Sequence, residues 1–98
     1  MNDLKPIIIV EDDIDDHEIF SEAFEAIGVK NELIFYTDAS KAFDFLLVTK
    51  HQPFFILSDI NLPGMNGLDF KTRIQQNEYL RTKSVPFIFL QQAHQNTR

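Results

Sequence analysis

The chain has 98 residues, 44% of them hydrophobic, and a formal net charge of −6, which describes one small acidic domain with an apolar core. The negative charge and the lack of a basic run argue against binding to nucleic acid. Cysteine is absent, which excludes disulfides, thiolate catalysis and zinc sites built on Cys. The first residues lack the pattern of a signal peptide, and no apolar run reaches the roughly 18–20 residues that cross a membrane. We therefore expect a cytoplasmic protein of one domain.

Apolar runs and helical patterns alternate from the N-terminus. Residues 6–10 form a continuous apolar run with β-branched side chains, which predicts a strand buried on both faces. From Ile14 the pattern becomes that of an amphipathic helix, which we expect Gly28 to end. The apolar side chains at helical spacing are Phe20, Ala23, Phe24 and Ile27.

The second pair of elements follows directly. Residues 33–36 predict a second strand. Asp38 or Ser40 can cap the helix after it, because both side chains accept hydrogen bonds from free backbone N–H groups. The apolar side of this helix consists of Ala42, Phe43, Leu46 and Leu47.

Pro53 begins a third predicted strand, which runs to Ser58. After the Pro63-Gly64 turn, a helix is expected from about Asn66 to Gln76. We predict that the stretch Tyr79–Lys83 is a loop leading into a fourth strand, Phe87–Leu90.

The order β-α-β-α-β-α-β with short connections predicts an α/β fold, an open parallel sheet with helices on both faces. Residues 91–98 are polar and carry no helical apolar stripe, so they are predicted to form a tail and not a fifth βα unit. A single domain is therefore expected over residues 1–98.

Acidic side chains follow two of the predicted strands. Glu11, Asp12 and Asp13 come after the first strand, and Asp59 comes at the end of the third. Ligands bind at this end of open α/β sheets, so neighbouring strands would bring three or four carboxylates together. Their repulsion raises the pKa of at least one of them, and a divalent cation such as Mg²⁺ removes that penalty. Asp59 can then attack phosphorus to give an aspartyl phosphate.

The sequence resembles the receiver domain of two-component response regulators, the CheY-like, flavodoxin-like fold. The resemblance lies in Ile7–Asp13 and Asp59–Gly67, together with Pro86 before the fourth strand, and it extends over residues 4–90. It implies strand order 2-1-3-4 and a role in a phosphorelay, with a histidine kinase or phosphotransfer protein as partner. It also implies a signalling domain that is not a metabolic enzyme and has at most autophosphatase activity.

Carried over by position, the resemblance assigns a role to each residue of the acidic site. It implies that Asp59 is the phosphoacceptor, that Glu11 and Asp12 are the acidic pair with Asp12 the direct magnesium ligand, and that the backbone carbonyl of Asn61 completes the metal site. Asp13 has no family role, and we interpret it as an acid that stabilises the start of the first helix.

Two family features differ in this chain. The Thr or Ser that ends the fourth strand is replaced by Gln91, and the Lys and the switch aromatic of a fifth strand have no counterpart. We therefore expect a receiver truncated before the fifth strand, whose exposed fourth strand favours a homo-oligomer. Two functions stay open: a phosphorylated signalling receiver, and a degenerate receiver that acts only as a protein–protein binding module.

Other interpretations of the same residues are weaker. A calcium loop starting at Asp59 would need an acidic ligand where Phe70 stands, and a phosphatase of the haloacid dehalogenase type would need a second Asp where Asn61 stands. The ten Phe residues are expected in the core and in interfaces. Three histidines are expected on the surface or in loops, without a phosphodonor role: His17, His51 and His94.

Overall fold

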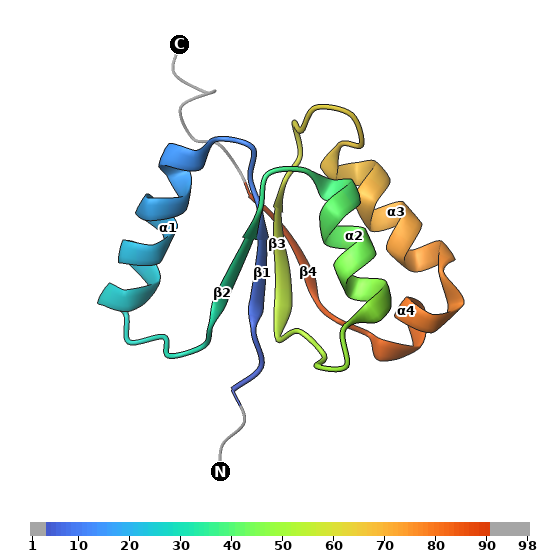
Figure 1. The fold of residues 1–98 in the computed structure, drawn as a ribbon, viewed down its shortest axis with the longest axis horizontal. Helices are drawn as coiled ribbons and strands as arrows, with labels where there is room; N and C mark the ends of the chain where they lie inside the picture. The colour runs from blue at the N-terminus through green and yellow to red at the C-terminus, as the bar shows by residue number, and fades with distance from the viewer. Residues whose placement is uncertain (1–3, 91–98) are drawn as a thin grey trace.

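The computed structural model describes residues 4–90 and contains one parallel sheet in the order β2-β1-β3-β4 (Figure 1). This arrangement confirms the predicted α/β fold and its strand order. Gln91, His94 and the predicted polar tail lie outside the described residues. The strands are β1 (Ile7–Val10), β2 (Leu33–Tyr36), β3 (Phe55–Asp59) and β4 (Phe87–Leu90).

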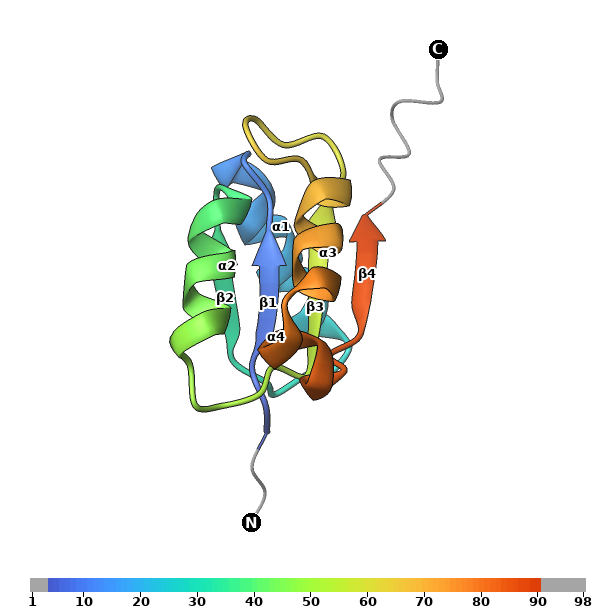
Figure 2. The same cartoon turned by 90° about the vertical axis from the view of Figure 1, so that its right-hand side faces the viewer.

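The helices cover the two faces of the sheet unequally. Among the described residues 4–90, one face is covered by α1 alone, and the opposite face is covered by α2, α3 and α4 (Figures 1 and 2). No helix within residues 4–90 has the length and apolarity that a bilayer span requires. The helices are α1 (Ile14–Ala26), α2 (Ala39–Val48), α3 (Gly67–Gln76) and α4 (Glu78–Lys83).

The prediction of a loop at Tyr79–Lys83 was wrong, because this stretch lies in α4. The helix begins where the Asn77 side chain accepts a hydrogen bond from the backbone N–H of Leu80, at 2.9 Å. It ends at Ser84, which adopts a left-handed conformation with φ of 52°. Leu80 is buried in the interior, so this short helix combines a side-chain cap with an apolar anchor.

Side-chain caps fix where the longer helices begin. Of the two candidates for α2, the structure selects Asp38, whose carboxylate accepts from the backbone N–H of Lys41 at 2.9 Å. The hydroxyl of Ser40 donates to the same carboxylate at 2.8 Å. The carboxylate of Asp13 caps α1 by accepting from the backbone N–H of Asp15, consistent with its predicted role at a helix start.

The central strand β1 is buried along its whole length, as predicted. Its side chains alternate between the two faces, so that Ile8 and Val10 join the cluster under α2, α3 and α4, while Ile7 and Ile9 join the cluster under α1. In the register between β1 and β3, Val10 lies beside Ser58. Glu11, which follows β1, and Asp59, the last residue of β3, therefore emerge at the same end of the sheet.

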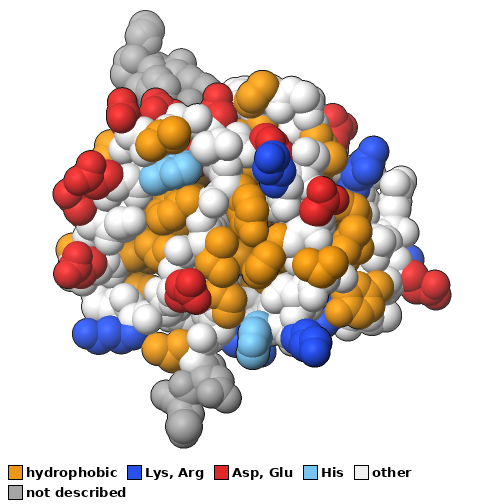
Figure 3. Space-filling model, viewed as in Figure 1, with side chains coloured by type: hydrophobic (Ala, Val, Ile, Leu, Met, Phe, Trp, Pro, Cys, Tyr) orange, Lys and Arg blue, Asp and Glu red, His pale blue; other side chains and the backbone are white. Residues whose placement is uncertain are grey.

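The apolar stripe predicted for α1 is only partly buried. Phe20 and Phe24 pack against the sheet, but Ala23 is exposed and Ile27 is 74% exposed. Figure 3 shows a band of hydrophobic side chains between α1 and α2, over the edge strand β2, whose four residues are all half-buried. Leu33 and Phe35 of β2 belong to the cluster under α1, and within residues 4–90 this single helix leaves both partly exposed.

Candidate functional site

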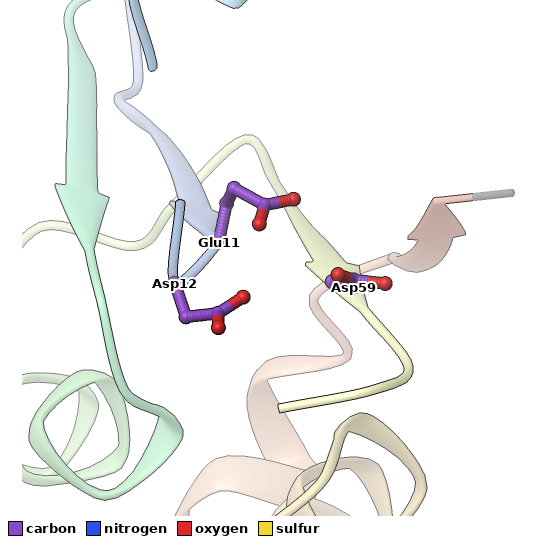
Figure 4. Close-up of side chains that lie close together, drawn as sticks. All are labelled: Glu11, Asp12 and Asp59. Atoms are coloured by element: carbon purple, nitrogen blue, oxygen red, sulfur yellow. The ribbon is translucent and has the colours of Figure 1, made fainter. Parts of the chain in front are cut away.

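Three carboxylates meet at the carboxyl ends of β1 and β3 (Figure 4). One carboxylate oxygen each from Glu11, Asp12 and Asp59 lies within 4.8 Å of the other two. Glu11 is 3% exposed and Asp59 is 2% exposed, whereas Asp12 is exposed at the mouth of the site. The predicted convergence of acidic side chains from two neighbouring strands is therefore confirmed.

Backbone hydrogen bonds fix the position of Glu11. Its N–H donates to the carbonyl oxygen of Tyr36 at 2.9 Å, which ties the end of β1 to the end of β2. Its side-chain Oε2 accepts from the N–H of Asp13 at 3.0 Å, so the carboxylate folds back over the start of α1. The acidic residue is held from both its backbone and its side chain.

The turn after Asp59 depends on a glycine at the start of α3. Gly67 donates its N–H to the carbonyl oxygen of Ile60 at 2.9 Å, which closes the turn. A Cβ atom built on Gly67 would overlap the backbone carbonyl oxygen of Asp59. Only glycine allows this close approach, which holds β3 and the loop containing Asn61 against the helix.

Burial and charge act together on Glu11. Its burial raises the pKa of the Glu11 carboxyl to about 7, and the nearby charge of Asp59 acts in the same direction, although the hydrogen bond from the Asp13 N–H opposes both. Carboxylate oxygens held this close are hard ligands that suit Mg²⁺, and a divalent cation would offset their repulsion. The donor set therefore fits the cation that the sequence predicts.

His17 was predicted to lie on the surface, and the structure shows that it is more buried than expected. It lies on the first turn of α1, half-buried, with Nε2 2.7 Å from the backbone carbonyl oxygen of Glu11. Its ring stacks on Phe35 of β2, with 4.5 Å between the ring centroids. His51, by contrast, is exposed, as predicted.

The sequences of known proteins indicate the same family as the geometry of the acidic pocket. Residues 7–98 match the response regulator receiver domain family. The chain is 32% identical to the response regulator Rcp1 of Synechocystis sp. (strain ATCC 27184 / PCC 6803 / Kazusa), over 95% of this chain and 65% of the relative. It therefore spans a little less than two thirds of that protein's length.

Solved structures give the same result. The bacteriophytochrome response regulator AtBRR superposes with a TM-score of 0.82 at 29% identity, over 97% of this chain and 73% of that one. The phosphorylated cyanobacterial phytochrome response regulator RcpA gives a TM-score of 0.73 at 26% identity, over 91% and 67% of the two chains. A parallel sheet in the order β2-β1-β3-β4 with an acidic pocket at its carboxyl end is typical of α/β signalling domains. The chain belongs to the response regulator receiver domain family.

Proposed function

We propose that this receiver works in a phosphorelay, in which Asp59 accepts a phosphoryl group from a histidine kinase or phosphotransfer protein in the presence of Mg²⁺. The observation that carries the proposal is the meeting of Glu11, Asp12 and Asp59 at the ends of two adjacent strands. The similar protein RcpA is phosphorylated in its solved structure, which supports the same chemistry here. Such a relay operates in the cytoplasm, where we expect this chain to act.

The residues of the site have different roles in the proposed phosphoryl transfer. A carboxylate oxygen of Asp59 forms a bond to phosphorus as the bond from phosphorus to the donor nitrogen breaks, and the electron pair of that bond stays on the donor. Asp12, Asp59 and the backbone carbonyl of Asn61 would bind the metal directly, and Glu11 would complete the acidic pair. Bound Mg²⁺ would neutralise negative charge on the phosphoryl oxygens. Later attack by water on the aspartyl phosphate returns the carboxylate and releases phosphate, which would be the only catalytic activity of the domain.

The phosphorylation test is intact-mass spectrometry after incubation with acetyl phosphate and Mg²⁺. We expect the wild-type chain to gain one phosphoryl group and the Asp59→Asn variant to gain none. Asp69→Asn is the matched control, because Asp69 is an exposed acid on α3. Chelation of Mg²⁺ with EDTA should abolish the gain in the wild-type chain and in Asp69→Asn.

The second candidate function is a binding module without phosphorylation. It is favoured by Gln91, which stands where the family places the Thr or Ser that contacts the phosphoryl group. Absence of any mass gain in the wild-type chain would support this alternative and overturn the first.

We further propose that the receiver forms a homo-oligomer through β4. Within residues 4–90, β4 pairs only with β3, so its other edge presents free backbone groups (Figure 2). The strand sequence Phe87–Leu90 contains no charged residue, and Ile88 is 46% exposed. A second copy can pair with this edge and cover Ile88 in the same step.

Sedimentation velocity at high micromolar concentration tests the oligomer. We expect a dimer or larger assembly for the wild-type chain, and a monomer for Ile88→Lys, because the added charge opposes edge pairing. Ile19→Lys is the control, since Ile19 is a similarly exposed apolar residue on α1. A clean wild-type monomer would contradict the proposal.

A further inference from the structure

We propose that His17 is a positioning residue for the metal site, which holds the peptide group between Glu11 and Asp12 in the orientation that Mg²⁺ binding requires. The inference rests on the proposed function, because it assigns a role in binding the same cation. It concerns a side chain that touches neither the metal nor the phosphoryl group and acts through the loop that carries the acidic pair.

The hydrogen bond of His17 has a defined direction. A carbonyl oxygen offers only lone pairs, so Nε2 must carry the proton that it shares with the Glu11 oxygen, 2.7 Å away. One face of the imidazole ring also packs on the ring of Phe35, with an angle of 18° between the two ring planes. The hydrogen bond and the ring contact together fix the rotamer of His17.

The carbonyl that His17 holds belongs to the peptide group linking Glu11 to Asp12. The N–H of Glu11 is already bound to Tyr36 of β2, so the hydrogen bond from His17 fixes the other side of the same residue. The orientation of this peptide group determines the direction in which the exposed Asp12 side chain leaves the backbone. Removal of the His17 donor would let the peptide group rotate and Asp12 move away from Glu11 and Asp59.

Groups that hold a metal ligand in place without touching the metal contribute strongly to affinity, and their loss commonly weakens binding by about 10–100-fold. His17 supports a backbone group and not a ligating atom, so we expect an effect at the low end of this range. A purely structural role for His17 predicts a different result, which is lower stability with unchanged affinity of the folded protein for Mg²⁺.

The test is isothermal titration calorimetry of Mg²⁺ into the full chain, at one pH, with variants that separate the two contacts. His17→Phe keeps an aromatic ring against Phe35 and removes the donor, and we expect the Kd for Mg²⁺ to rise about tenfold. His17→Gln keeps an amide donor at a similar reach and removes the ring, and we expect it to bind Mg²⁺ more tightly than His17→Phe. His51→Gln is the control at an exposed histidine and should match the wild type.

Hydrogen exchange of the same proteins without Mg²⁺ gives a second readout. The amides of Asp12 and Asp13 should exchange faster in His17→Phe, while those of β3 and α2 keep their wild-type rates. If His17→Phe does not fold, His17→Gln must still bind Mg²⁺ more tightly than His17→Ala, because these two lack the ring and differ in the donor. Equal affinities in that pair, or wild-type affinity in a folded His17→Phe, would overturn the positioning role. A wild-type chain that binds no Mg²⁺ would instead contradict the proposed function.

Discussion

The apolar interior under α2, α3 and α4 and the acidic pocket above it are consecutive parts of the same strands, yet they follow opposite physical rules. Val10 is completely buried among apolar side chains, and the next residue, Glu11, is almost as buried but carries a carboxyl group. Burial of Val10 stabilises the fold, whereas burial of an acid beside Asp59 costs stability. A protein keeps a buried acid that lowers its stability where a ligand needs that acid, so the contrast supports the proposed metal-binding role of Glu11.

The largest effect is expected from the interior. Phe70 of α3 is fully buried and meets the ring of Phe87 edge-on, with 5.4 Å between centroids. Phe70→Ala should lower the free energy of unfolding by about 3–5 kcal/mol, because it removes buried apolar surface and leaves a cavity. Urea denaturation followed by circular dichroism measures the loss. Leu68→Ala on the same helix is the control, because Leu68 is exposed and its loss should cost less than about 0.5 kcal/mol.

A substitution in the acidic pocket should raise the free energy of unfolding, whereas Phe70→Ala lowers it. Without metal, the pKa of Glu11 is about 7 in the folded chain and 4.5 in the unfolded reference. The folded state therefore binds more protons between these values, so the free energy of unfolding falls as pH rises from about 4.5 to 7, by at most about 1.4 kcal/mol per pH unit for one proton. Glu11→Gln removes this loss and should stabilise the metal-free protein at pH 8 by roughly 1–3 kcal/mol.

Denaturation in EDTA between pH 5 and 8 measures this dependence. Glu18→Gln, at an exposed acid of α1, should retain the wild-type pH slope. Addition of Mg²⁺ at pH 8 should stabilise the wild-type chain more than Glu11→Gln. If Glu11→Gln is less stable than wild type at pH 8 without metal, the pocket stabilises the fold and the contrast with the interior is lost.

The sheet could be predicted from the sequence because its strands are short apolar runs bounded by turn residues. The strands Leu33–Tyr36 and Phe87–Leu90 have the predicted bounds, whereas β3 begins at Phe55, two residues after the predicted start. The helix α4 was missed because its six residues are too few to show a helical period, and it depends on the Asn77 cap and on burial of Leu80.

The acidic pocket could be predicted because strand ends in a parallel sheet gather at one edge. The contact of His17 could not be predicted, because it depends on Phe35 of β2, which only the folded chain brings near α1. Helical spacing likewise predicted the apolar side of α1 but not its exposure. Ile27 is the residue that ends α1 and is 74% exposed, and within residues 4–90 α1 is the only helix on its face of the sheet.

The smallest change in stability is expected from Asp38, whose side chain caps the start of α2. Asp38→Ala removes the acceptor for the Lys41 N–H and should cost about 1 kcal/mol, because α2 buries Ala39, Ala42 and Leu46 in the interior and cannot fray without exposing them.

The hydrogen bond from the Lys41 N–H lowers the pKa of Asp38 below its usual 3.8. The contribution of this hydrogen bond to stability is therefore present above pH 3.8 and is lost as pH falls through the lower pKa of the folded state. Ser40→Ala removes only one donor to the carboxylate and should cost less. Denaturation at pH 7 and pH 3 measures both variants. If Asp38→Ala costs as much as Phe70→Ala, the start of α2 and not the apolar interior limits stability.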